Sequence, residues 1–285
     1  MASFPWLEGG AMTLKLIATD MDGTLLRDDR TYDYDRMRRL LDEMDARGIL
    51  FVAASGNQLG QLKNYFAEVG PERINYVSDN GALVTYRGET LAEATLSRTQ
   101  LSQVITWNNA NFAKMENLII LSGDKGAYVS NNVPASIMAE TEKYYTNLMQ
   151  VEKLLDVDDQ IFKLSLVWPP TVSVYESVKS LRTVFEGELH ATGSGFGSVD
   201  VLAHGVNKQT GLVELGKSLN IRPDEMVAFG DNANDLEMLR FVKYPFLMPN
   251  AEAFMHDRIK QTALNSNNEN GVLDTIEALL DGRLH

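Results

Sequence analysis

The 285-residue chain contains no cysteine, which excludes disulfide bonds, thiolate metal ligands and cysteine nucleophiles. It also lacks an apolar run long enough to cross a bilayer, and its start has no basic segment followed by an apolar one. We therefore expect no membrane partner, and we interpret residues 1–12 as a leader or tag. The missing cysteine is compatible with the reducing cytoplasm, where we expect a monomer or small homo-oligomer.

Basic residues are also in short supply. The chain has 26 Lys and Arg against 39 Asp and Glu, giving a formal net charge of −13. Because no basic stripe offsets this charge, it argues against nucleic acid or an anionic membrane as the main partner. An anionic substrate would need local help from a metal ion or a lysine.

What the chain has instead is an alternation of apolar runs and amphipathic helices. With 44% hydrophobic residues it can bury a large core. The pattern predicts an α/β fold with a parallel, doubly wound sheet and helices on both faces. Expected strands are 49–54, 74–77, 226–229 and 244–248. Expected helices are 32–47, one starting just after residue 57, 209–219, 235–241 and 252–263.

The pattern changes in the middle of the chain, where we expect an inserted α+β domain. The main domain would then comprise residues 13–86 and 199–285, and the insertion residues 87–198. Within the insertion the expected strands are 119–121, 128–129 and 161–168, and the expected helices 100–115, 135–149 and 172–185.

Two acids follow the first apolar run, at Asp20 and Asp22. In an open α/β sheet, ligands bind beyond the carboxyl ends of the strands, so these acids would lie at the functional edge. A calcium loop would need glycine at its sixth position and an acid at its twelfth. Those positions hold Leu25 and Thr31, which excludes such a loop.

Two further segments are suited to binding an anion. Ser55 and Gly56 follow the strand 49–54 and precede a helix, where a hydroxyl and free backbone amides can bind a phosphate oxygen. A further strand is expected over 198–203, and Lys208 follows it, immediately before the expected helix 209–219. A lone lysine is usually a solvated surface residue, so Lys208 counts only through this context.

A fourth segment is rich in oxygen ligands. The strand 226–229 is followed by Gly230, Asp231, Asn234 and Asp235. Such a cluster suits a hard cation such as Mg²⁺. Helix capping by Asn234 or Asp235 can hold at the same time, but it does not explain Asp231.

Taken in order, these four segments resemble the motifs of the haloacid dehalogenase superfamily of aspartate-nucleophile phosphatases. The size and position of the insertion are similar to the cap of its Cof-like branch (type IIB, C2 cap), and residues 80–82, 249–251 and 270–272 match further segments of that branch. The runs 55–58 and 192–200 resemble bacterial sugar phosphatases. One departure is Asn57, where many members carry arginine.

The resemblance implies a role for each site residue. Asp20 would attack phosphorus to form an aspartyl-phosphate, and Asp22 would protonate the leaving group and then activate water. Mg²⁺ would be bound by Asp20, the Asp22 carbonyl and Asp231, with Asp235 nearby. The phosphoryl group would be held by Ser55, Lys208, Asn234 and the amides near Met21 and Gly56.

The expected function is therefore Mg²⁺-dependent hydrolysis of small phosphorylated metabolites, with sugar phosphates favoured. Flavin mononucleotide and pyridoxal phosphate are alternative substrates, and a phosphotransferase or phosphomutase could use the same intermediate. A non-catalytic phosphosugar-binding regulator on this fold is a further alternative, disfavoured because both Asp20 and Asp22 are present.

Overall fold

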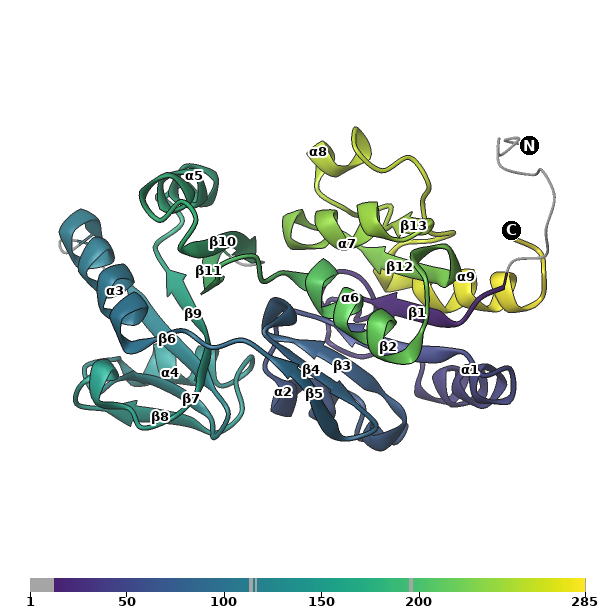
Figure 1. The fold of residues 1–285 in the computed structure, drawn as a ribbon, viewed down its shortest axis with the longest axis horizontal. Helices are drawn as coiled ribbons and strands as arrows, with labels where there is room; N and C mark the ends of the chain where they lie inside the picture. The colour runs from purple at the N-terminus through teal and green to yellow at the C-terminus, as the bar shows by residue number, and fades with distance from the viewer. Residues whose placement is uncertain (1–12, 113–114, 116, 195–196, 285) are drawn as a thin grey trace.

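The chain forms two β-sheets in a computed structural model that describes residues 13–112, 115, 117–194 and 197–284. Figure 1 shows them as two adjacent parts of the ribbon, with helices packed around each. We call the sheet of β13-β12-β1-β2-β3-β4-β5 with its helices the seven-stranded half. The sheet of β10-β11-β9-β6-β7-β8 with its helices is the six-stranded half. The expected leader lies outside the described residues.

Five strands of the first sheet are parallel, as the strand and helix alternation predicts. Two antiparallel strands extend the sheet at one edge. The parallel strands are β13 (Tyr244–Leu247), β12 (Met226–Gly230), β1 (Leu16–Thr19), β2 (Leu50–Ala54) and β3 (Asn75–Ser78), and the added pair is β4 (Leu83–Tyr86) and β5 (Glu89–Glu93).

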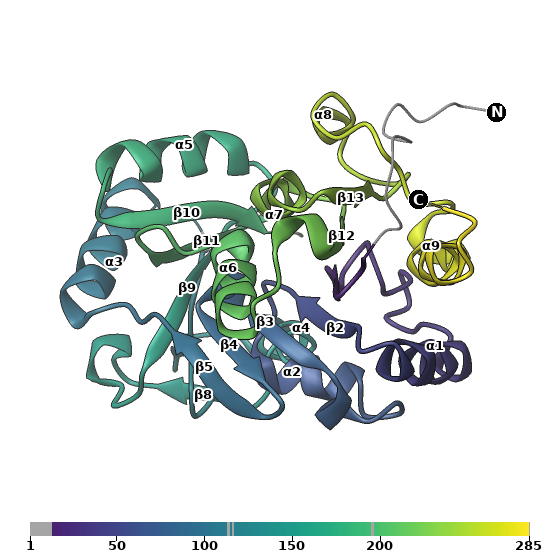
Figure 2. The same ribbon diagram turned by 45° about the vertical axis from the view of Figure 1, so that its right-hand side comes forward.

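Helices cover both faces of this sheet, so it is doubly wound (Figures 1 and 2). One face carries α1 (Tyr34–Ala46), α2 (Leu59–Tyr65) and α9 (Gly271–Leu280); the other carries α6 (Lys208–Leu219), α7 (Leu236–Phe241) and α8 (Ala253–His256). In α1 the buried residues recur at helical spacing, and the Asp33 side chain caps the first turn by accepting from the Arg36 amide.

The strand order places the predicted acids together. From β1 the chain proceeds through β2 and β3 on one side, whereas β12 and β13 lie on the other. The order therefore reverses between β1 and β12, and parallel strands end at the same edge. Asp20 follows β1 and Asp231 follows β12, so both reach the crevice at this reversal.

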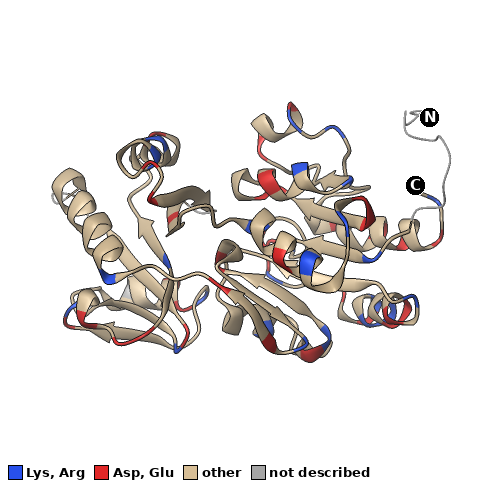
Figure 3. Cartoon of the chain, in the orientation of Figure 1, with Lys and Arg blue, Asp and Glu red and all other residues tan. Residues whose placement is uncertain are grey.

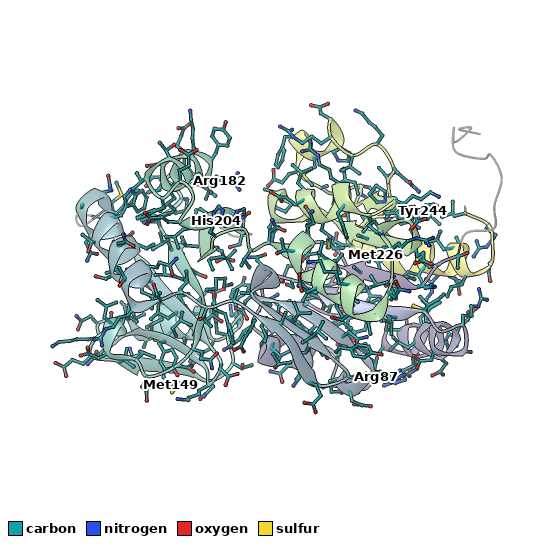
Figure 4. The ribbon with its side chains drawn as sticks, in the orientation of Figure 1. Arg87, Met149, Arg182, His204, Met226 and Tyr244 are labelled. Atoms are coloured by element: carbon teal, nitrogen blue, oxygen red, sulfur yellow. The ribbon has the colours of Figure 1, made fainter. Side chains whose placement is uncertain are left out.

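The six-stranded half is an α+β layer, as expected for the insertion. Its strands are β6 (Leu118–Gly123), β7 (Ala127–Ser130), β8 (Leu148–Val151), β9 (Ile161–Val167), β10 (Leu189–Ser194) and β11 (Ser198–Ala203). Helices α3 (Arg98–Phe112) and α5 (Val174–Val184) pack on one face and α4 (Ala135–Thr141) on the other. The side chain of Arg182, labelled in Figure 4, ties α5 to β10 through Nε and the Ala191 carbonyl, 2.7 Å apart.

Sheet membership differs from the expected domain boundaries at two strands. β5 pairs with β4 in the first sheet although it lies beyond residue 86, and β11 pairs with β9 and β10 in the second although it lies almost wholly beyond residue 198. Backbone pairing decides this membership, and it leaves no periodic signal that marks the partner strand.

Two predicted helices are much shorter than expected. The helix over 135–149 ends as α4 at Thr141, and Asn147 takes a left-handed φ of 52° before β8 pairs with β7. The helix over 252–263 ends as α8 at His256, because Gln261 and Ala263 hydrogen-bond to Leu247 on the open edge of β13. In both segments strand pairing overrides a helical apolar pattern.

Within the described residues, no helix is both long enough and apolar enough to span a membrane. Acidic and basic residues are interspersed on the same elements, as α1 shows in Figure 3. There, for example, Arg38 pairs with Asp35, and Arg73 reaches Asp42 and Asp45 from a neighbouring turn. Exposed pairs of this kind contribute little stability, typically about 0–1 kcal/mol each.

The close approach of α6 to β3 gives a test of the packing. A Cβ on Gly211 would lie 2.4 Å from Cγ1 of the buried Val77. Gly211→Ala should gain up to about 1 kcal/mol of helix propensity but lose about 1–3 kcal/mol to overpacking. We expect a lower urea unfolding midpoint.

The matched control is the double variant Val77→Ala/Gly211→Ala, in which space for the new methyl group is created. Its loss in free energy of unfolding should be smaller than the sum of the two single losses. A stabilised Gly211→Ala protein would contradict the packing described.

Candidate active site

Asp20 and Lys208 form the centre of the site. The hydroxyl and amide of Thr210 form a capping box with Asn207, which starts α6 at Lys208. The Lys208 ammonium donates to Asp20 Oδ1 at 2.6 Å and is fully buried. Burial disfavours its charge, but Asp20 and Asp235 raise the pKa of Lys208 above its usual value. Lys208 is therefore a fixed positive charge beneath the carboxylate of Asp20.

Asp235 both caps a helical turn and binds the lysine. Its Oδ1 accepts from Lys208 Nζ at 2.5 Å, and its Oδ2 accepts from the amides of Asp231 and Asn232 at 2.9 and 3.0 Å. Gly230 makes this possible, because a Cβ there would lie 2.5 Å from Asp235 Cβ. Capping and charge pairing therefore occur together.

Asp231 is held from the opposite loop. Thr24 donates its hydroxyl to Asp231 Oδ1 at 3.1 Å. Gly23, between Asp22 and Thr24, has a φ of +75°, and a Cβ there would lie 2.6 Å from Asp231 Oδ2. The loop after β1 can approach Asp231 this closely only without a side chain at Gly23. The role of Thr24 was not among the sequence predictions.

The three carboxylates fit a divalent cation. Asp20, Asp231 and Asp235 each offer an oxygen atom, and these atoms lie within 4.8 Å of one another. Among the described residues, Lys208 is the one lysine that pairs with them, so three acids face a single positive charge. Burial raises the pKa of Asp20 to about 7, against the ammonium of Lys208, while burial and the two neighbouring acids raise the pKa of Asp231 to about 8. A hard cation with oxygen ligands would supply the missing charge.

Asp22 lies beside this cluster and is held by Asn57. The Asn57 side-chain amide donates to Asp22 Oδ2 at 2.6 Å and to Ser55 Oγ at 3.1 Å. The residue that departs from the family pattern thus joins the expected proton-transfer group to the expected phosphate-binding hydroxyl. An arginine at this position would add a positive charge that the amide does not.

A cavity of about 280 Å³ connects these residues to the six-stranded half. The expected residues Asp20, Asp22, Ser55, Gly56, Asp231 and Asn234 line it. Lys208 and Asp235 are not among the lining residues and are reached through Asp20 and Asp231. The side chain of Met21 packs in the hydrophobic core, so only its backbone can contribute to the site.

The wall contributed by the six-stranded half was not predicted. It contains Tyr144, Tyr145, Lys163, Ser165 and Asp200. One signal was available: Lys163 interrupts the apolar strand 161–167, which is unusual unless a buried partner is present. That partner, Asp200, is 37 positions away in the sequence, and only strand pairing brings the two together.

Comparison with known proteins agrees with this architecture. Residues 17–276 match the family described as haloacid dehalogenase-like hydrolases. The site lies where the strand order reverses and contains three clustered acids, two of them buried, and a buried lysine. The chain belongs to this family. The expected family and α/β fold are thereby confirmed.

Among its relatives is the 5-amino-6-(5-phospho-D-ribitylamino)uracil phosphatase YbjI of Escherichia coli (strain K12). It is 35% identical over 269 residues, which cover 94% of this chain and 97% of the relative. A crystal structure from Streptococcus mutans UA159 has 33% identity and a TM-score of 0.86, covering 94% and 99% of the two chains. A HAD/COF-like hydrolase from Plasmodium vivax, 23% identical with coverage of 96% and 98%, shares the fold with a TM-score of 0.82.

The raised pKa values predict that metal binding is linked to protons. Near pH 7 a fraction of Asp20 and Asp231 is protonated, and a cation must displace those protons. We therefore expect Mg²⁺ affinity to rise from pH 6 to above pH 8 and then level off. Calorimetric titration in two buffers of different ionisation enthalpy measures the protons released.

Two variants sharpen this measurement. Asp231→Asn should weaken Mg²⁺ binding and reduce proton release, whereas Asp224→Asn, at an exposed acid far along the surface, should change neither. Proton release that is absent in the wild type would refute the linkage.

Proposed function

We propose that this protein is a Mg²⁺-dependent phosphatase that hydrolyses small phosphorylated metabolites, sugar phosphates above all, through an aspartyl-phosphate. The observation that carries the proposal is the set formed by the buried Asp20, Lys208 and Asp235 and the half-buried Asp231 at one end of the cavity. Membership of the hydrolase family and the phosphatase activity named for the Escherichia coli relative support it.

In the first step the Asp20 carboxylate attacks phosphorus. Lys208 holds Oδ1, which leaves Oδ2 to form the new bond. As the bond from phosphorus to the ester oxygen breaks, Asp22 transfers a proton to the departing alkoxide. The product alcohol leaves, and Asp20 carries the phosphoryl group.

In the second step water attacks the aspartyl-phosphate. Asp22, now ionised, takes a proton from this water, and the bond between phosphorus and the Asp20 oxygen breaks to release inorganic phosphate. The amide of Asn57, 2.6 Å from Asp22, keeps the carboxylate oriented through both transfers. Asp22 therefore ends each cycle protonated and Asp20 ionised.

The remaining site residues neutralise and orient the phosphoryl group. Asp20, Asp231, Asp235 and the Asp22 carbonyl would hold Mg²⁺, which when bound supplies positive charge to the phosphoryl oxygens. Hydrogen bonds to the phosphoryl oxygens would come from Ser55, Asn234 and the amides near Met21 and Gly56. Lys208, enclosed behind Asp20, would stabilise the phosphoryl group through its positive charge. In this proposal most of the catalytic effect is positioning and charge stabilisation.

The six-stranded half would act as the cap that selects the leaving group. Its cavity wall includes the hydroxyl-bearing residues Thr141, Tyr144, Tyr145, Ser165 and Ser194, which suit a polyhydroxylated leaving group. A second candidate substrate is a ribityl phosphate, because the Escherichia coli relative is named for one. We also propose a cytoplasmic location, with which the absence of cysteine is compatible.

The nucleophile assignment is tested by Asp20→Asn. We expect Mg²⁺-dependent phosphate release to fall by roughly 10³-fold or more, because the amide cannot form the intermediate. The variant should stay folded, since Lys208 keeps its pairing with Asp235. Circular dichroism measures whether the variant is folded, and a phosphate-release assay measures its activity. Asp224→Asn is the control variant. Retained activity in Asp20→Asn would contradict the assignment.

The substrate class is tested with a panel of phosphate esters and Mg²⁺. We expect kcat/KM to be at least about tenfold higher for sugar phosphates and ribityl phosphates than for pyridoxal phosphate, which offers few hydroxyl groups to the cavity wall. The assay contains no acceptor sugar. Release of phosphate and of the product alcohol in equal amounts would therefore support hydrolysis. Turnover that requires an added acceptor would instead identify a phosphotransferase.

A further inference from the structure

Asn80 lies between the proposed phosphate site and the six-stranded half. It occupies the short turn after β3, is almost fully buried and has a left-handed φ of 54°. Its side-chain oxygen accepts from Asn234 Nδ2 at 3.0 Å, and its side-chain nitrogen donates to Asp200 Oδ2 at 2.8 Å. One amide group thus joins a residue of the seven-stranded half to one of the six-stranded half.

Asp200 is the centre of a buried polar network on β11. Besides Asn80, it accepts from Lys163 Nζ at 3.2 Å and from Ser165 Oγ at 2.6 Å. Lys163 Nζ in turn donates to the Gly56 carbonyl at 2.6 Å. The network therefore reaches two positions of the proposed phosphate site, Asn234 through Asn80 and Gly56 through Lys163.

The energetics of this network favour positioning over stability. Lys163 and Asp200 are 3% and 1% exposed, and desolvating such a pair costs about as much as their attraction returns. What a satisfied buried network does provide is a single arrangement of its donors and acceptors. Because Asn80 takes one hydrogen of the Asn234 amide, the other remains for a ligand in the cavity that Asn234 lines.

We propose that Asn80 is a positioning residue: held by Asp200, it orients the Asn234 amide toward the phosphoryl group. The phosphate site is then complete only when the six-stranded half is seated on the loops after β2 and β3. This inference rests on the proposed phosphatase function and adds a residue to it. It makes phosphate binding dependent on a residue that does not touch phosphate.

A purely conformational role for Asn80 gives a different expectation. Asparagine tolerates left-handed backbone well, and glycine tolerates it better. If only the turn mattered, Asn80→Gly would leave phosphate binding unchanged. If the Asn80 side chain orients Asn234, Asn80→Gly must weaken phosphate binding.

The experiment compares Asn80→Gly with Asn220→Gly. Asn220 also has a left-handed φ, 53°, but ends α6 at an exposed position. For Asn80→Gly we expect the inhibition constant of inorganic phosphate and the KM of every substrate to rise roughly tenfold. A rise of this size corresponds to the loss of about one hydrogen bond to phosphate. A common factor across substrates is expected because phosphate is common to all. Asn220→Gly should leave these values unchanged.

A double-variant cycle with Asn234→Ala tests the route. If Asn80 acts through Asn234, then adding Asn80→Gly to Asn234→Ala should have little further effect on phosphate inhibition. Fully additive losses, or unchanged inhibition in Asn80→Gly, would overturn the inference. Failure of the proposed function is distinct, because the wild type would then release no phosphate with Mg²⁺.

Discussion

The site depends on one buried lysine placed between two carboxylates. Lys208 is fully enclosed, and both Asp20 and Asp235 pair with it. A buried ammonium without partners would be strongly destabilising. Three segments must therefore meet: the C-terminal end of β1, the start of α6 and the turn after β12. The fold and the charge arrangement therefore constrain each other at a single point.

The second constraint is the seating of one sheet on the other. A cavity of about 280 Å³ exists because loops after β1, β2 and β12 face strands of the six-stranded half. The polar contacts across this boundary, such as Lys163 to Gly56 and Asn80 to Asp200, are buried and directional. The groups that we propose to be catalytic come from one half and much of the cavity wall from the other, so the proposed reaction chemistry is separated from substrate choice.

The core elements were predictable because each has a strong local signal. The strand before Asp20 is a short apolar run, and α1 places its buried residues at helical spacing. Helix predictions were wrong where pairing with a distant strand decided the outcome, as at 135–149 and 252–263. Pairing also decided which sheet β5 and β11 join, the first at a sheet edge and the second between two strands. Local periodicity carries no information about such partners.

The sequence by itself determined the chemistry available to this protein. Four ordered segments contain the acids, the lysine and the hydroxyl that the proposed phosphoryl transfer needs. Their residue types and their positions after strands are local properties. Only the tertiary structure decided how these groups are supported. Thr24 beneath Asp231, Asn57 beside Asp22, and Asn80 between the two halves are contacts between segments far apart in the chain, which folding alone brings within hydrogen-bond distance.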